Sequence, residues 1–503
     1  MDQTASADKP LKWYQGLQKY CWVVLVISAL GWLFDTMDQN LFNLVRKSSM
    51  EELLYPDQAF LAEVKAKMKA EKDPVKRDEL KKGLPSHLSA EARAAWGKAV
   101  DARGGTVTMV FMFGWAAGGF IFGILGDQLG RTKTMIITIL IYAVFTGLSG
   151  LVGTWQLYAA ARFFTGLGVG GEWAAGAALV AETFPQRSRP MALGLLQALS
   201  SVGNMMAAVI TLVITSMNMD WRIVYFVGAA PAIMVLWIRR SVHEPEQWVH
   251  AKERASVGKE MGKIGELFTH PVLRRNLISS VLLCTAGVAA LWGIGFFSTD
   301  FIQTELRSGK VAERTIDQVK SVMFFLQNLG SFFGIYTFAI IAEKFNRRKA
   351  FAVSYVLAWI SILIFFWGLS GMGASARIPA LILAPVMGFC TLMPFSGFTI
   401  YFPELFPTRL RTTGCGFAYN ASRVLAAGAP QALAWIASLM ATYENGVRVK
   451  GGFAQAATVV AFVYVLGFIG TWLGPETKGK PLPDERDFEL APEIKAAPAP
   501  QQP

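Results

Sequence analysis

Long apolar runs separated by short polar segments dominate the chain. Twelve of these runs have roughly the 20 residues that a helix needs to cross a bilayer, and they lie at 20–44, 106–129, 134–153, 155–181, 190–216, 221–238, 275–302, 319–342, 350–371, 378–402, 413–440 and 452–474. Backbone polar groups in lipid must be satisfied internally, so each run is expected to form a helix. The pattern predicts an all-α membrane protein with twelve transmembrane helices.

Two repeated segments divide the runs into two sets of six. The segment 126–133, GDQLGRTK, follows the second run and 342–349, AEKFNRRK, follows the eighth, with an acid, an arginine and a lysine in register. The segment 182–189, ETFPQRSR, likewise recurs as 404–411, ELFPTRLR. These echoes predict two pseudo-symmetric six-helix bundles, an arrangement typical of transporters that bind substrate between their halves.

Polar segments between and beside the bundles complete the predicted organisation. We predict an N-terminal bundle at 20–238 and a C-terminal bundle at 275–474, with cytoplasmic segments at 1–19, 239–274 and 475–503, the last of them disordered. Residues 46–105 are rich in lysine and glutamate and interrupt the first bundle. The stretches 58–72 and 89–100 within them predict helices, so we expect an external helical insertion that lies outside the duplicated unit.

The charge distribution indicates an orientation and argues against a soluble protein. Charged residues make up only 17% of the chain, below the roughly 25% of soluble domains, and the net charge is +12. Many cations lie beside the apolar runs, with an excess in the short loops that share a side with the chain ends. Because cytoplasmic loops carry the excess of Lys and Arg, we expect both termini in the cytoplasm, a multi-pass protein of a bacterial inner membrane, and no nucleic-acid binding.

Signatures of enzymes, cofactors and metals are weak in this sequence. The four cysteines are scattered in or beside apolar runs without CxxC spacing, which favours core packing over a disulfide framework or metal site. The segment 166–171, GLGVGG, matches a dinucleotide-binding pattern, but it lies inside an apolar run with no preceding strand and so indicates close helix packing. We expect no enzymatic activity, no cofactor and no metal.

Four further motifs lie within the apolar runs or at their ends. They are GILGDQLGRTK at 123–133, RFFTGLGVGGEW at 162–173, PELFPTRLRTTG at 403–414 and PETKG at 475–479. Together they resemble the major facilitator superfamily, in particular its metabolite:proton symporters close to the sugar porters, and they imply the major facilitator fold. The seventh run, LLCTAGVAALWGIGFF at 282–297, lacks the glutamine-rich pattern of sugar binding, which disfavours a hexose substrate.

The resemblance also implies a gate at the cytoplasmic surface, in which ion pairs between the halves hold an outward-open state. The residues concerned are Asp127, Arg131, Glu182, Arg187, Glu343, Arg347, Glu404 and Arg409. Simple anchoring by the positive-inside rule is the alternative for the cations.

Five charged residues lie inside the apolar runs: Asp35, Asp38, Arg162, Glu172 and Arg423. A charge at the bilayer centre costs roughly 2.5–3.5 kcal/mol on insertion scales, so functional roles are expected. Asp35 and Asp38 are three positions apart, hence on one helix face, at a depth similar to that of Arg162. The resemblance implies that one aspartate forms a proton-coupling pair with Arg162. Asp35 is narrowly favoured over Asp38, and a purely structural pair is the alternative.

Arg423 lies near the middle of the eleventh run, and the matching position of the other half is Ser201. A lone midplane cation suits capture of a carboxylate, because a guanidinium binds it through two parallel hydrogen bonds. A structural pairing with Glu172 is the alternative. Side chains that could complete a substrate cavity are Asn420, Tyr419, Gln327, Asn328, Gln197, Trp115 and Trp292, although each alone is more typical of packing.

The sequence thus predicts proton-coupled symport of a small organic anion by alternating access, carried out by a monomer in the lipid bilayer. A monocarboxylate, a sugar acid or an aromatic acid fits this prediction. Two alternatives stay open: a neutral sugar symporter or facilitator, suggested by the sugar-porter-like motifs, and a transporter-like nutrient sensor.

Overall fold

A computed structural model describes residues 12–488 of the chain, apart from 72–75, 77–78, 81–82, 218, 256–259, 296, 441, 445–446 and 451. The outer parts of the two predicted tails, 1–11 and 489–503, lie outside the described residues. Eleven helical segments of the described part are long and apolar enough to cross a membrane. A short antiparallel hairpin of β1 (Thr442–Glu444) and β2 (Val447–Lys450) accompanies them. The prediction of an all-α membrane fold is therefore confirmed.

The N-terminal half contains five continuous spans and one broken span. The continuous helices are α1 (Lys19–Leu53), α4 (Ala90–Gln128), α5 (Arg131–Ser149), α6 (Trp155–Thr183) and α7 (Arg189–Ser216). The sixth span consists of α8 (Arg222–Gly228) and α9 (Ala232–Ser241). Pro231 precedes α9, and proline lacks the N–H that a continuous helix would need there.

The C-terminal half repeats this plan with more interruptions. Its spans are α12 (Pro271–Ala290) continued by the π-helix η2 (Leu291–Gly295) and α13 (Phe297–Ser308), then α14 (Glu313–Lys344), α15 (Arg347–Leu369), α16 (Arg377–Tyr401), α17 (Arg411–Ala426) with α18 (Ala429–Leu439), and α19 (Phe453–Ala461) with α20 (Tyr464–Leu473). The eleventh span breaks near Gly428, so neither α17 nor α18 alone reaches membrane length.

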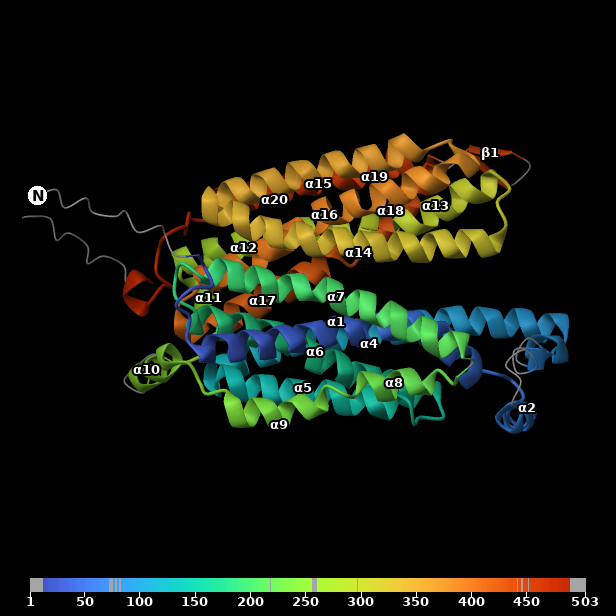
Figure 1. Ribbon diagram of the computed structural model, residues 1–503, viewed down its shortest axis with the longest axis horizontal. Coiled ribbons are helices and arrows are strands. Elements are labelled where there is room, and N and C mark those ends of the chain that lie inside the picture. Colours follow the sequence, from blue (N-terminus) through green and yellow to red (C-terminus); the bar gives the residue numbers. More distant parts are fainter. Residues whose placement is uncertain are drawn as a thin grey trace, which may run out of the picture.

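Short helices lie at the two ends of the bundle (Figure 1). The end with α10 (Glu246–Ala255), α11 (Glu266–Thr269), η4 (Phe402–Glu404), η5 (Thr408–Leu410) and η6 (Glu485–Phe488) is called the terminal face below. The opposite end, the cap face, carries α2 (Gln58–Ala70), η1 (Leu84–His87) and η3 (Gly373–Ala376). Helix α1 starts at the terminal face, so the described parts of both chain ends lie on one side.

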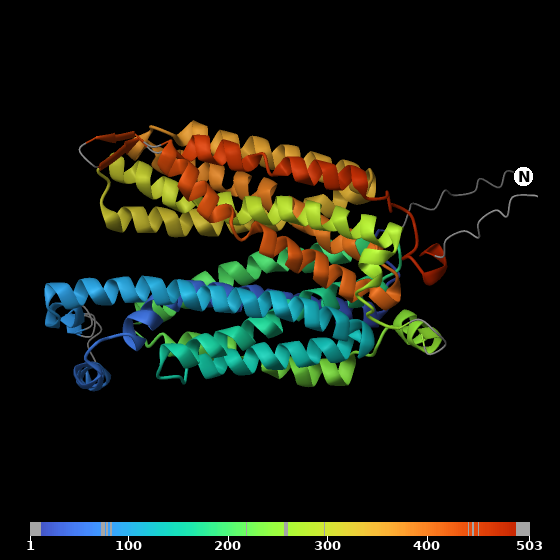
Figure 2. The ribbon, with the colours of Figure 1, turned by 180° about the vertical axis from the view of Figure 1, so that it is seen from behind.

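The two halves lie side by side, with the helices roughly parallel to the long axis in both views (Figures 1 and 2). Helices α4 and α7 of the first half pack against α17 and α14 of the second. Small residues allow close packing within a half as well: a Cβ on Gly170 would lie 2.0 Å from the carbonyl oxygen of Trp115 on α4. This contact confirms that the glycine-rich segment of α6 serves helix packing.

The structure divides the predicted insertion 46–105 differently from the sequence prediction. Helix α1 continues to Leu53 and α4 already begins at Ala90, so both ends of the segment are extensions of membrane spans. The indole of Trp96 on α4 donates a hydrogen bond of 3.1 Å to the Glu51 carbonyl oxygen on α1. The helices predicted at 58–72 and 89–100 are confirmed as α2 and the start of α4.

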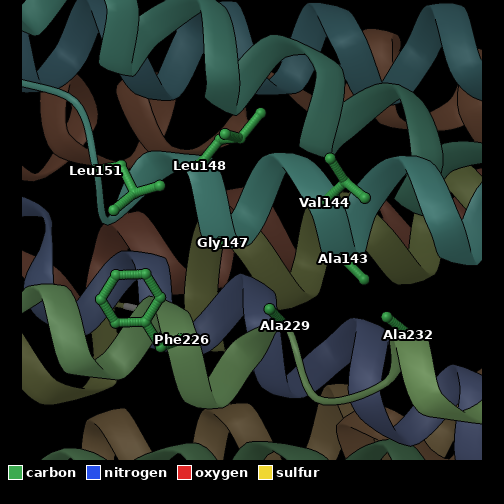
Figure 3. Close-up of a pocket in the computed structure, with 8 residues that line it drawn as sticks. All are labelled: Ala143, Val144, Gly147, Leu148, Leu151, Phe226, Ala229 and Ala232. Carbon is green, nitrogen blue, oxygen red and sulfur yellow. The ribbon is translucent and has the colours of Figure 1, made fainter.

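A shallow groove on the outer surface runs between α5 and the break of the sixth span (Figure 3). Its lining is apolar throughout: Ala143, Val144, Gly147, Leu148, Leu151, Phe226, Ala229 and Ala232. Leu151 and Phe226 are largely exposed, as expected for side chains that meet lipid. The groove therefore belongs to the bilayer-facing surface, and the charged sites lie on the other side of α5.

Candidate functional site

An ion pair between α1 and α6 is fully buried in the N-terminal half. Arg162 Nη1 lies 3.5 Å from Asp38 Oδ2, and neither side chain is exposed. Thr146 on α5 donates a 2.9 Å hydrogen bond to Asp38 Oδ1, and Arg162 Nε donates to the Ser149 hydroxyl at 2.9 Å. The sequence narrowly favoured Asp35 as the partner of Arg162, whereas the structure places Asp38 there.

The broken sixth span closes this pair from the side of the lipid. The Arg162 guanidinium lies 4.7 Å from the centre of the Tyr225 ring on α8, within cation–π range. At the end of α8, a Cβ on Gly228 would approach Asp38 Oδ1 to 3.1 Å. The break thus brings backbone directly against the carboxylate.

Asp35 lies one helical turn from Asp38 and contacts a different partner, Glu172 on α6. The two carboxyl groups interact electrostatically with each other, and both residues are buried. The sequence offered Glu172 as a possible partner of Arg423. The structure instead places it against α1.

Arg423 on α17 is held between two aromatic rings. Its guanidinium carbon lies 3.8 Å from the centre of the Trp115 ring and 4.2 Å from that of Tyr419. Tyr419 in turn stacks on Trp173 of the other half at 4.2 Å. Arg423 Nη1 donates a hydrogen bond of 3.3 Å to Asn420 Oδ1. No ion pair joins Arg423 to any described residue, and the acid that interacts with it electrostatically at longer range is Asp35.

Two other predicted cavity residues, Gln197 and Asn328, form hydrogen bonds between the halves. Gln197 Oε1 accepts hydrogen bonds from the Trp173 indole at 3.1 Å and from the Thr399 hydroxyl of the second half at 2.8 Å. Asn204 on α7 donates a 2.8 Å hydrogen bond to Asn328 Oδ1 on α14. Within the described residues, no hydrogen bond or ring contact joins Gln327 or Trp292 to Arg423. The structure therefore gathers Trp115, Tyr419 and Asn420 around Arg423, whereas Gln197 and Asn328 join the halves elsewhere.

Four charged residues take part in the ion pairs and hydrogen bonds that join the two halves at the terminal face. Arg131 forms ion pairs with Asp127 at 3.1 Å and with Glu182 at 2.9 Å. Arg411 of the second half reaches Glu182 at 2.5 Å, and Asp127 Oδ2 accepts a 2.8 Å hydrogen bond from the backbone N–H of Thr413. All four charged side chains are fully buried. We call this set, Asp127, Arg131, Glu182 and Arg411, the closed gate.

The second half repeats the arginine–glutamate pair of the first. Arg347 lies 2.7 Å from Glu404, as Arg131 lies beside Glu182. The helices that begin at these arginines are capped alike, because the backbone N–H groups of Arg131 and Arg347 donate to Glu244 and Glu476. Burial alone would raise the pKa of Glu476, but the backbone N–H groups of Lys478, Arg347 and Arg348 hold it below its usual value. Sequence reasoning missed Glu244, although an acid follows both the sixth and the twelfth run within a few residues.

Besides Arg347 and Glu404, three more of the predicted gate residues lie outside the closed gate. Arg187 is exposed and donates to the Gln15 carbonyl oxygen of the N-terminal segment. Glu343 is half-exposed, 4.0 Å from Arg347. Arg409 pairs with Glu266 and Glu485; burial alone would lower its pKa, but these carboxylates raise it above the usual value. The cation that joins the halves is Arg411 instead, which ends the repeated segment in register with Arg189.

Asp127 and Glu343 occupy matching positions in the repeat, but only Asp127 belongs to the closed gate. Substitutions of the two residues are therefore expected to have different effects. Asp127→Asn should destabilise the closed state, because the carboxylate accepts charge-assisted hydrogen bonds worth about 1.5–3 kcal/mol each. Cys415 lies buried next to this site on α17. In a background without the other cysteines, we expect its maleimide labelling to become about tenfold faster in Asp127→Asn. Glu343→Gln is the matched control. Equal labelling rates in both variants would mean that Asp127 helps to set the orientation of the chain in the membrane and does not hold the gate closed.

Comparison with known proteins places the chain in a family. Residues 97–430 match the family model described as Major Facilitator Superfamily. A probable 4-methylmuconolactone transporter of Cupriavidus pinatubonensis is 29% identical over 75% of this chain and 81% of its own. The sialic acid transporter NanX of Escherichia coli is 28% identical over 72% of this chain and 83% of its own.

Among solved structures, the proton:xylose symporter XylE has a similar fold, with a TM-score of 0.64 at 15% identity over 92% of this chain and 98% of its own. The duplicated six-helix halves, the repeated arginine–glutamate pairs and the matched family model agree on one assignment. The chain belongs to the major facilitator superfamily and is a multi-pass membrane transporter, not an enzyme.

Proposed function

We propose that this transporter carries a small organic anion into a bacterial cell together with protons. The observation that carries the proposal is Arg423, a buried cation with no acidic partner in ion-pair range among the described residues. Burying an unpaired charge is costly, and a bound carboxylate would remove that cost. The stacking of Trp115 and Tyr419 on the two sides of the guanidinium leaves its N–H edge as the part that can bind a ligand.

The chemistry around Arg423 also favours an anion over a neutral sugar. Sugar hydroxyls are bound by amide side chains without burying a charge, so a neutral substrate gives no reason to keep an arginine here. The two related transporters described above are named for 4-methylmuconolactone and sialic acid, and the second of these names an acid. Aromatic rings beside the cation would cover the apolar or planar part of such a substrate.

For proton coupling we propose the ion pair of Asp38 and Arg162. A proton on Asp38 would neutralise the carboxylate and leave Arg162 with only its hydrogen bonds to Ser149 and Phe145. The pair lies between α1 and α6, and the closed gate at the terminal face also involves α6 through Glu182. We infer that protonation loosens α1 against α6 and thereby favours opening at the terminal face, which is the cytoplasmic side in this proposal.

Uptake into proteoliposomes tests the proposal directly. Vesicles containing the full chain are given an inward proton gradient and a panel of carboxylates, each matched by its amide, together with neutral sugars. We expect at least one carboxylate to accumulate with concurrent proton influx, and its amide not to accumulate. Accumulation of a sugar but of no acid would favour the neutral-sugar alternative, whereas binding without any turnover would favour the sensor.

A further inference from the structure

Arg46 lies near the end of α1 at the cap face and has no role in the mechanism above (Figure 1). We propose that Arg46 forms a second binding site for carboxylates, which captures the organic anion on the cap side before the anion reaches Arg423. The hand-over to Arg423 rests on the proposed function, whereas the anion site itself does not.

The Arg46 side chain lies along α4, where one hydrogen bond holds it. Its Nη1 donates to Thr108 Oγ1 at 2.6 Å, and a Cβ on Gly104 would lie 3.9 Å from its Nε. The Thr108 hydroxyl itself donates to the Gly104 carbonyl oxygen at 3.0 Å, so its oxygen is left to accept. A guanidinium carries five N–H donors, and no ion pair or other hydrogen bond joins Arg46 to a described residue. The remaining donors are therefore available to a carboxylate.

Helix α4 places this contact in line with the substrate site of the proposed function. Thr108 precedes Trp115 by seven residues, which is two helical turns, so both lie on one face of α4. Trp115 stacks on Arg423 of the second half, and this face is therefore turned toward the other half. At a rise of 1.5 Å per residue, the two positions are about 10 Å apart along the helix. The contact of Arg46 thus lies about two turns closer to the cap face than the contact of Arg423.

The surroundings of Arg46 are open. Arg46 and Thr108 are half-buried, and Asn43, one turn before Arg46 on α1, is exposed. A Cβ on Gly105, one turn before Thr108, would meet no atom within 4 Å. The terminal face, by contrast, is closed by the gate. In the proposed function a molecule reaches Arg423 from the cap face while the gate is closed, and Arg46 lies on that side.

Two arginines at different depths can collect and then retain an anion. Positive charge at the entrance raises the local concentration of anions. A separation of about 10 Å along α4 is too long for one carboxylate to bind both guanidinium groups at once. Arg423 is buried and has already lost its water, so it gains more from an anionic partner than half-buried Arg46 does. The carboxylate is therefore captured at Arg46 and retained at Arg423.

The rate of thiol labelling beside Arg46 tests the anion site without any substrate. Asn43→Cys, in the full chain without its native cysteines, is labelled with two methanethiosulfonate reagents, one bearing a negative sulfonatoethyl group and one a neutral hydroxyethyl group. The neutral reagent reports accessibility, so the ratio of the two rates isolates the effect of charge. We expect Arg46→Gln to lower the anionic-to-neutral ratio about three- to tenfold at low salt and much less at about 1 M salt. Arg46→Lys should keep most of the ratio, because it keeps the charge.

Arg103→Gln is the matched control. Arg103 lies on the same part of α4 as Thr108, but its guanidinium stacks on the Trp155 ring of α6 at 4.5 Å. Loss of this cation should leave the ratio near the wild-type value. A ratio unchanged in Arg46→Gln, or lowered equally in Arg103→Gln, would overturn the anion site.

Uptake kinetics test the hand-over to Arg423. For a carboxylate that accumulates in wild-type vesicles, Arg46→Gln should raise KM about three- to tenfold at low salt, because capture is slower. The value of kcat should stay near that of the wild type, because the complex at Arg423 is unaltered. An unchanged KM would overturn the hand-over. Failure of the proposed function is seen separately, as absence of carboxylate uptake by the wild type.

Discussion

Arg423→Gln is expected to weaken carboxylate binding about 10- to 100-fold and to leave binding of the matched amide nearly unchanged. Hydrogen bonds from a charged donor contribute about 1.5–3 kcal/mol each, and glutamine offers one neutral donor group in place of the guanidinium edge. The measurement is calorimetric binding of an acid and its amide, chosen from the liposome panel, to wild type and variant. Thermal unfolding of both proteins checks that the fold is retained.

Arg423→Lys serves as the charge-conserving comparison. Lysine keeps the positive charge but loses the planar fork and its stacking between Trp115 and Tyr419. We therefore expect it not to restore the affinity for the acid. Equal loss of both ligands in Arg423→Gln, or no loss, would mean that the arginine supports the scaffold, and would make a neutral sugar the better substrate hypothesis.

The membrane spans were predictable from the sequence because their signal is one of length and composition. A run of about 20 apolar residues has few alternatives to a transmembrane helix. The duplicated segments also indicated the two halves, and the structure shows their consequence in the matching pairs Arg131–Glu182 and Arg347–Glu404. Pro430, at the start of α18, is a signal for the break near Gly428. Pro385 and Pro394, however, lie inside the continuous α16, so a proline alone does not distinguish a broken span from an unbroken one.

The sequence showed that charged residues lie inside the membrane spans, but it did not show which residues they contact. Asp35 and Asp38 share a helix face, and a sequence alone does not give the rotation of α1 against α6, which decides which acid meets Arg162. The same holds for Glu172, whose contact with Asp35 depends on the space at Gly31. At the gate, Arg409 and Arg411 are two positions apart, and only the path of η5 decides that Arg411 reaches Glu182.

Several charged contacts between the two halves lie at the terminal face. Ion pairs and hydrogen bonds between the halves are concentrated at the terminal face, where Asp127 and Glu182 bind Thr413 and Arg411. Tyr419 and Trp173 stack across the interface above them. In the proposed function, these contacts separate a molecule bound at Arg423 from the terminal face and must break for its release on that side.

Asp38→Asn is expected to abolish proton-driven accumulation while much of the substrate exchange is retained. The amide resembles a permanently protonated aspartate, so Arg162 lacks its ion-pair partner in every state and the step that depends on deprotonation is lost. Counterflow of labelled substrate without a proton gradient measures exchange, and uptake with a gradient measures accumulation. Thr146→Val is the matched control, because it removes the 2.9 Å hydrogen bond to Asp38 and keeps the charge; it should still accumulate substrate.

The result also distinguishes the two aspartates of α1, Asp38 and Asp35, from each other. If Asp38 couples the proton to the conformational change, Asp38→Glu should recover part of the accumulation, since a carboxyl group again faces Arg162. If Asp38→Asn instead accumulates substrate like the wild type, the Asp38–Arg162 pair is structural, and its low exposure and hydrogen bonds then serve only to hold α1 against α6. Coupling would in that case move to Asp35, the other aspartate on this face of α1, and Asp35→Asn should show the uncoupled behaviour expected here for Asp38→Asn.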